Sequence, residues 1–209
     1  MEDVLEVYKR PRDPLRPVVC MDEQPTQLIR ETRIPLPVKP GEPAKYDYEY
    51  ERGGTAVNFM FTAPLEDWRR VSVRERKTKK DWAEEIRELV DVDFPEAETI
   101  VLVMDNLNTH TPGALYEAFA PEEARRILER LEIHYTPKHG SWLNMAEIEL
   151  SVFTRQCLDR RIPDLGTLRS EAAVWYRSRN ASSKRVDWQF TTETARVKLK
   201  RLYPQFLTC

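Results

Sequence analysis

Two short apolar runs that each end in aspartate constrain the fold of this chain most. Residues 17–23 read PVVCMDE, and residues 99–106 read TIVLVMDN. The second run has five consecutive apolar residues before Asp105, which is typical of a central strand covered on both faces. The first run has the same design and ends at Asp22. Both runs therefore predict buried strands of a sheet.

Three further strands are expected from composition and alternation. β-Branched and aromatic residues over 55–63 and alternating residues over 68–75 predict a pair of neighbouring strands. Residues 131–137 predict another strand.

Helices are expected between and after these strands. Thr78, with Asp81 three residues later, predicts a capped helix start that continues to about Val90. Proline at a first helical position indicates two more starts. These two starts lie at Thr111-Pro112 and Ala120-Pro121. Three further helices are expected over about 143–158, 164–179 and 191–202. The order predicts an α/β fold, a mixed five-stranded sheet with helices on both faces.

Proline and glycine mark the irregular parts of the chain. Residues 1–16 are polar, with prolines at 11 and 14, and are expected to form a flexible N-terminal arm. The density of prolines and glycines over 31–54 predicts a long loop. Residues 17–209 are then expected to form one folded domain.

The overall composition excludes several classes of protein. The three cysteines form no C-x-x-C pair, which argues against a disulfide framework and a thiolate zinc site. No apolar run is long enough for a membrane helix, and the N-terminus does not resemble a signal peptide, so we expect no membrane partner and a cytoplasmic location.

The charge pattern is ambiguous. The net charge of -2 is not that of a typical nucleic-acid-binding domain. However, residues 69–80 hold seven basic residues and one acidic residue, and residues 195–201 are also basic. Such a run is more often a solvated face than a DNA-binding site, so charge alone does not decide.

The two strand-end aspartates predict a metal site. In α/β sheets the carboxyl ends of strands face the ligand crevice, so Asp22 and Asp105 should converge. Carboxylates that approach each other repel and need cations or protons to coexist. Divalent Mg²⁺ suits such oxygen ligands, and Asn106 and Asn108 could support the site. Each aspartate alone would more often be a turn or cap residue, and the matching context of the two favours the metal site.

A third acid is expected from the helix over 143–158. Its buried stripe should consist of Leu143, Ala146, Leu150, Phe153 and Cys157. Glu147 and Glu149 lie about equally far from the centre of this stripe, on opposite sides, so periodicity does not choose between them.

Three motifs together resemble a known family. The segments C-M-D-E, V-M-D-N-L-N-T-H and T-P-K-H-G-S-W-L-N-M-A-E-I-E resemble the IS-six-thirty insertion-sequence family of bacterial transposases, within the Tc/mariner superfamily of DDE enzymes. The resemblance runs from about Pro17 to Phe206 and implies a ribonuclease-H-like catalytic domain. It implies Asp22 and Asp105 as catalytic and metal-binding acids. Its L-N-x-x-E element places the third acid at Glu147, leaves Glu149 less favoured, and makes Asn144 a supporting residue.

The resemblance also implies function and partners. Two Mg²⁺ or Mn²⁺ ions would assist DNA cleavage at the ends of the element and strand transfer into target DNA, at TA sites. The protein would act in the bacterial cytoplasm, associated with the nucleoid. It would pair as a homodimer, or with an intact transposase or the product of an upstream frame. The N-terminal helix-turn-helix domain of full-length relatives is expected to be absent from these residues.

The rival functions are a structure-selective nuclease of the same fold, which cuts without joining, and an inactive or regulatory transposase fragment. Basic residues that could contact DNA phosphates without reading sequence are also identified. They are Arg69, Arg70, Lys77, Lys79, Lys80, His139, Arg155, Arg160 and Arg161.

Overall fold

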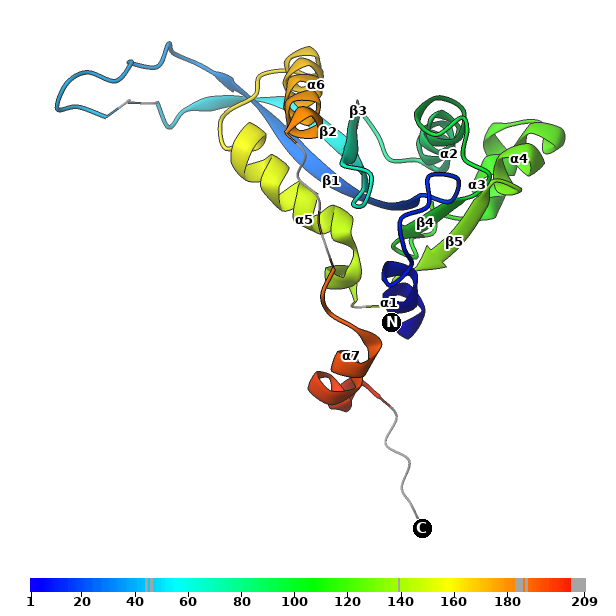
Figure 1. Ribbon diagram of the computed structural model, residues 1–209. Helices are drawn as coiled ribbons and strands as arrows, with labels where there is room; N and C mark the ends of the chain where they lie inside the picture. The colour runs from blue at the N-terminus through cyan, green and yellow to red at the C-terminus, as the bar shows by residue number, and fades with distance from the viewer. Residues whose placement is uncertain (44, 46, 139, 183–185, 187, 204–209) are drawn as a thin grey trace.

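A mixed five-stranded sheet forms the centre of the molecule (Figure 1). The structure, a computed structural model, describes residues 1–43, 45, 47–138, 140–182, 186 and 188–203. The strand order is β3-β2-β1-β4-β5. β1 is antiparallel to β2 and parallel to β4, β2 is antiparallel to β3, and β4 is parallel to β5. The predicted sheet is therefore confirmed. The strands are β1 (Val18–Glu31), β2 (Tyr50–Ala63), β3 (Trp68–Arg74), β4 (Ile100–Met104) and β5 (Leu131–Tyr135).

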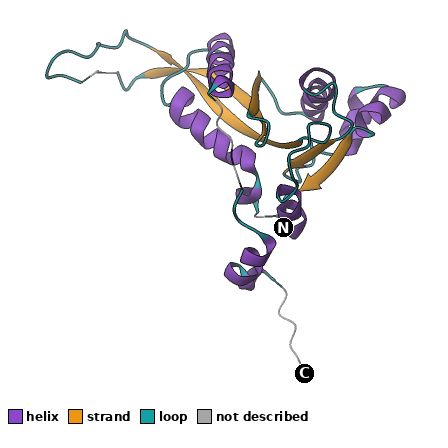
Figure 2. Ribbon diagram, viewed as in Figure 1, coloured by secondary structure: helices purple, strands orange, loops and turns teal. Residues whose placement is uncertain are grey.

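Helices cover both faces of the sheet, as predicted (Figure 2). Because successive residues of a strand point to opposite faces, Cys20 packs into one core and Met21 into the other. The first core, on the side of Cys20, is closed by α1 (Glu2–Tyr8), α5 (Met145–Phe153), α6 (Leu165–Ala181) and α7 (Thr192–Lys198). The second core is closed by α2 (Lys79–Glu88), α3 (Pro112–Ala118) and α4 (Pro121–Leu128).

Local sequence explains how two of these helices are placed. Thr78 and Asp81 form the expected capping box at the start of α2, and Trp82 and Ile86 are buried beneath it. The expected α5 stripe is confirmed, since all its members are buried; they are Leu143, Ala146, Leu150, Phe153 and Cys157. The helix over 143–158 is less regular than expected: a 3-10 turn over 141–143 precedes α5 and a π-helical turn over 154–158 follows it.

The long loop expected over 31–54 is shorter than predicted. β1 continues to Glu31, which pairs with Tyr50, so both strands extend into a ribbon that projects from the body (Figure 1). The register shifts between Leu28 and Ile29, which pair with Gly54 and Arg52, so Gly53 is the extra residue of a β-bulge. A side chain at Gly53 would lie only 2.5 Å from the carbonyl oxygen of Pro163, so glycine is required where the ribbon passes this loop.

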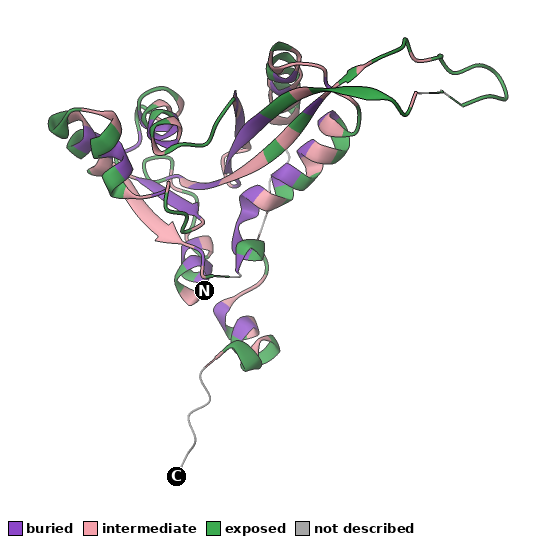
Figure 3. Ribbon diagram, turned by 180° about the vertical axis from the view of Figure 1, so that it is seen from behind, coloured by how far each residue is buried: buried purple, intermediate pink, exposed green. Residues whose placement is uncertain are grey.

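The expected flexible arm over residues 1–16 is wrong for its first half. Residues 2–8 form α1, and Val4, Leu5 and Val7 are buried in the first core (Figure 3). The hydroxyl of Tyr8 also donates a 2.7 Å hydrogen bond to the carbonyl oxygen of Leu143. The prolines begin only at residue 11, so a short amphipathic helix fits before them. In the described part of the chain, no helix has both the length and the apolar character needed to cross a bilayer.

Candidate active site

The parallel pairing of β1 and β4 brings Asp22 and Asp105 together on one face of the sheet, at the edge where β4 ends. β1 does not end there but continues to Glu31, so the prediction that Asp22 ends its strand is wrong. Val18, Val19 and Cys20 pair with Val101, Leu102 and Val103, and the same offset continued along both strands sets Asp22 beside Asp105. Cys20 and Val103 point into the first core, and each aspartate lies two residues further on. Both aspartates therefore point toward the face that α5 covers.

Asp22 lies among other carboxylates. Burial raises its pKa to about 6, and the charges of Asp105, Glu147 and Glu23 push the pKa in the same direction. A hydrogen bond of 2.8 Å from the backbone N–H of Glu23 to Oδ1 of Asp22 opposes this. Glu147 on α5 therefore lies close enough for its charge to act on Asp22.

Asn144 fixes the start of α5 against β1. Its side-chain oxygen accepts from the backbone N–H of Ala146, and its side-chain nitrogen donates 2.7 Å to the carbonyl oxygen of Met21. One buried side chain thus caps the helix that carries Glu147 and holds it to the strand that carries Asp22. The first turn of α5 contains Glu147.

Glu149 points away from this edge. It is fully buried, with Oε2 2.7 Å from Nε of Arg179 and 3.2 Å from Nε of Arg69. A buried carboxylate already paired with two guanidinium groups is a structural ion pair that joins α5 to α6 and β3. Packing thus distinguishes the two acids that periodicity left equivalent: Glu147 is partly exposed and Glu149 is enclosed.

A buried histidine that was not predicted to have a role lies between Asp105 and Glu23. Nδ1 of His110 lies 2.6 Å from Oδ1 of Asp105, and Nε2 lies 2.8 Å from Oε1 of Glu23. The two carboxylates raise the pKa of His110 to about 9, although burial alone would lower it. The signal was present in the quoted motif D-N-L-N-T-H, which ends at this residue.

The donor set fits divalent cations in its chemistry. Within the described ranges, no group of three histidine, cysteine or acidic side chains stands close enough to enclose one ion. Mg²⁺, however, keeps several waters and takes only one or two carboxylates from the protein beside substrate phosphates. Burial already raises the pKa of Asp22. Bound cations would stabilise the charged form of Asp22 and of the carboxylates around it.

A hollow of about 380 Å³ opens beside Asp105. Its lining includes Asn106, Thr136, Lys138 and Ser141, so backbone and side-chain donors surround one side of the acid. Asn106 thus lies where a supporting residue was expected. Asn108 is exposed in the same loop and is not part of this lining.

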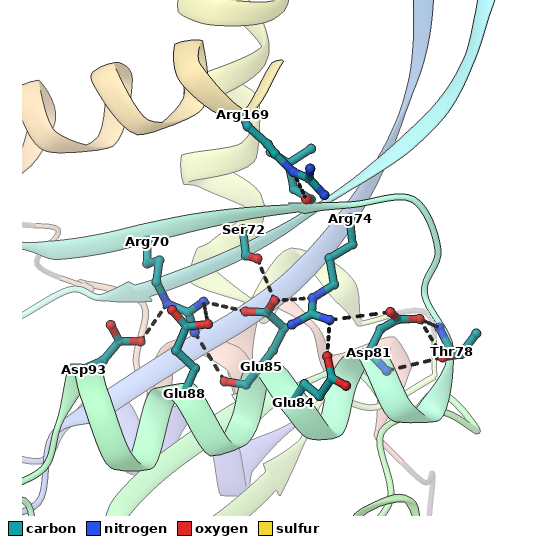
Figure 4. Close-up of polar contacts among 11 residues, drawn as sticks. Arg70, Ser72, Arg74, Thr78, Asp81, Glu84, Glu85, Glu88, Asp93 and Arg169 are labelled. Carbon is teal, nitrogen blue, oxygen red and sulfur yellow. Dashed lines mark hydrogen bonds and ion pairs between the residues drawn. The ribbon is translucent and has the colours of Figure 1, made fainter. Parts of the chain in front are cut away.

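Two of the arginines expected to contact DNA are structural, which corrects the prediction. Arg69 is fully buried against Glu149. Arg70 is buried between β3 and α2, with Nε 2.7 Å from Asp93 and Nη1 2.5 Å from Glu85 (Figure 4). Arg69 and Arg70 are neighbours on β3, so they point to opposite faces of the sheet. Arg69 meets Glu149 of α5 on one face and Arg70 meets Glu85 of α2 on the other, and both charges are neutralised there.

The other basic candidates lie at the surface, where several are already paired. Lys79 pairs with Glu117, Arg160 with Glu171, and Arg161 with Glu31. Lys77 is 3.6 Å from Glu23 and therefore lies close to the aspartate pair. Lys80 and Arg155 are exposed, and His139 lies outside the described residues.

Solved structures share this fold, and one family model matches most of the chain. The family model described as "DDE superfamily endonuclease" matches residues 17–169. No curated protein sequence matches the chain.

Among solved structures, the Mos1 mariner paired-end complex with Mn is similar, with a TM-score of 0.58 and 17% identity over 85% of this chain and 52% of that one. The Mos1 strand transfer complex gives a TM-score of 0.58 and 16% identity over 85% and 51%. The pre-cleavage Mos1 transpososome gives 0.56 and 16% over 88% and 53%.

The likeness to these structures shows a shared fold, and the chain spans about half the length of the mariner chains that it matches. The family match covers well over half of the chain, from just before β1 into α6. The chain therefore belongs to the DDE superfamily of endonucleases.

Proposed function

We propose that this chain carries the DNA cleavage and strand-transfer chemistry of a Tc/mariner-type transposase, with Asp22, Asp105 and Glu147 holding two Mg²⁺ or Mn²⁺ ions. The observation that carries the proposal is that Asp22 on β1 lies beside Asp105 at the end of β4, with the charge of Glu147 on α5 acting on Asp22. Membership of the DDE endonucleases gives this arrangement its reaction class.

Each acid has a distinct place in the proposal. Asp22 lies on β1 and Asp105 directly follows the adjacent parallel strand β4, so the sheet would hold both acids, and the cations between them, in a constant position. Glu147 comes from α5, which Asn144 holds to β1, so it would reach the cations from the helix side of the site. Bound cations would activate the attacking oxygen and stabilise the leaving oxygen of the phosphodiester.

DNA is the proposed partner. The solved relatives are described as paired-end, strand transfer and transposon-end complexes, one of them with Mn. Lys77, Lys80 and Arg155 are exposed and are the candidates that would contact phosphates. Insertion at TA sites, the finer placement in the IS-six-thirty family and a homodimeric assembly belong to the same proposal.

A joining assay separates this function from its rivals. The full chain would be incubated with supercoiled plasmid and a labelled duplex that ends in a free 3′-hydroxyl, with Mg²⁺ or Mn²⁺. The proposal predicts metal-dependent nicking and covalent joining of the label to plasmid, with junctions at TA when sequenced. Nicking without joining under either metal would favour a structure-selective nuclease, and no reaction would favour an inactive fragment.

A further inference from the structure

His110 lies between Asp105 and Glu23, within hydrogen-bond distance of both. We propose that His110 is a positioning residue that orients the Asp105 carboxylate and links it through Glu23 to the strand of Asp22. This inference rests on the proposed metal site. It concerns a residue that would touch neither metal nor DNA.

The hydrogen bonds of His110 join β1, which carries Glu23, to the residue that follows β4. On one side its Nδ1 is 2.6 Å from Oδ1 of Asp105, and on the other its Nε2 is 2.8 Å from Oε1 of Glu23. Glu23 follows Asp22 directly, and its backbone N–H donates 2.8 Å to Oδ1 of Asp22. One imidazole therefore connects the two aspartates from behind the sheet edge.

The ring itself is held rigidly. His110 is fully buried, and its ring lies 5.8 Å from that of Trp82, with an interplanar angle of 29°. The hydroxyl of Tyr135 donates 2.8 Å to the carbonyl oxygen of His110. A donor fixed in this way selects one orientation of the Asp105 carboxylate and leaves its second oxygen, Oδ2, for a cation.

The chain contains a matched control for this geometry. His134 on β5 also bridges two carboxylates, with Nδ1 2.7 Å from Asp3 and Nε2 2.9 Å from Glu132. Its partners come from α1 and β5, and neither is an acid of the proposed site. Replacing either histidine by phenylalanine removes two hydrogen bonds and keeps an aromatic ring.

The test is a Mn²⁺ titration of the full chain. Binding is measured by calorimetry or from the electron paramagnetic resonance signal of free Mn²⁺. His110→Phe is expected to raise the Mn²⁺ dissociation constant by about tenfold or more, the usual effect of losing a hydrogen bond behind a ligand. His134→Phe is expected to leave the dissociation constant close to that of the wild type. Plasmid nicking by His110→Phe should recover at high Mn²⁺ concentration, which a merely structural defect would not do.

Each outcome decides between the two proposals. A folded His110→Phe protein that binds Mn²⁺ like the wild type, while Asp105→Asn does not bind, overturns the role of His110 alone. Normal Mn²⁺ binding by Asp105→Asn overturns the metal site and the role of His110 together. If His110→Phe does not fold, Glu23→Gln, which preserves size, is measured instead: weaker Mn²⁺ binding supports the link, and unchanged binding overturns it.

Discussion

The side-chain nitrogen of Asn144 donates a 2.7 Å hydrogen bond to the carbonyl oxygen of Met21, the residue immediately before Asp22. The same side chain caps α5 through the backbone N–H of Ala146. Helix and strand are thus tied together one residue before the first acid of the proposed site and three residues before the third.

Replacing Asn144 by alanine should therefore destabilise the protein more than the loss of an ordinary cap. A lost cap costs about 1 kcal/mol, and an unpaired buried carbonyl adds about 1–3 kcal/mol. Urea unfolding measures the effect, with Asp164→Ala, which removes the cap of α6 alone, as the control. Equal losses of unfolding free energy in the two variants would contradict the tether.

Glu149 should be required for folding rather than for chemistry. Glu149→Ala leaves Arg69, whose side chain is 0% exposed, without this carboxylate, and breaking a buried pair costs about 3–5 kcal/mol. Glu147→Ala, in the same helix but partly exposed, should lower the unfolding free energy far less. Thermal unfolding of the two variants checks this, and a stable Glu149→Ala protein would show that the ion pairs do not hold α5.

Acid pH should loosen the N-terminal segment. Hydrogen bonds from Arg10 and His134 lower the pKa of Glu132 to about 2, and Arg16 adds to this. A carboxyl with a lowered pKa in the folded state contributes stability that is present above its unfolded pKa of about 4.3 and is lost as pH falls toward 2. Limited proteolysis at residues 9–16 should increase over that range in the wild type. Glu132→Gln should be cleaved readily at every pH, and equal protection at pH 7 in both proteins would contradict the contact.

Lys80 and Arg70 should behave oppositely although both belong to one basic run. Lys80 is exposed, so Lys80→Ala should preserve stability, weaken plasmid binding and reduce the slope of log affinity against log salt by about 0.9. Arg70→Ala should destabilise the protein because Glu85 is fully buried beside it. Binding measured over a salt series, together with thermal unfolding, distinguishes them; an unchanged salt slope for Lys80→Ala removes it from the DNA contacts.

Sequence patterns predicted the sheet well because β4 and the start of β1 are apolar runs, while β2 and β3 show β-branched or alternating residues. Asp22 and Asp105 could be placed together because both follow apolar runs that pair in parallel, although β1 continues past Asp22 to Glu31. Glu147 could not be separated from Glu149 in the same way, since the choice depends on Arg69 and Arg179, which come from β3 and α6. Such pairings join residues far apart in the chain and have no local signature.

Two other features of the structure could not be predicted from the sequence, for related reasons. α1 is too short to show a helical period, and its burial depends on packing against the first core. The inward-facing arginines of β3 resemble a basic surface until the acids of α2 are placed opposite them, as Glu85 is opposite Arg70 and Arg74 (Figure 4).

The most direct test of the proposed site is Mn²⁺-dependent nicking of supercoiled plasmid by the wild type, Asp105→Asn and Glu147→Gln, with Glu122→Gln on the exposed start of α4 as the control. The proposed site predicts that Asp105→Asn and Glu147→Gln remain folded and lose nicking to the level seen without metal. Glu122→Gln should nick like the wild type. Nicking at the wild-type rate by either Asp105→Asn or Glu147→Gln would contradict the assignment of these acids to the metal site.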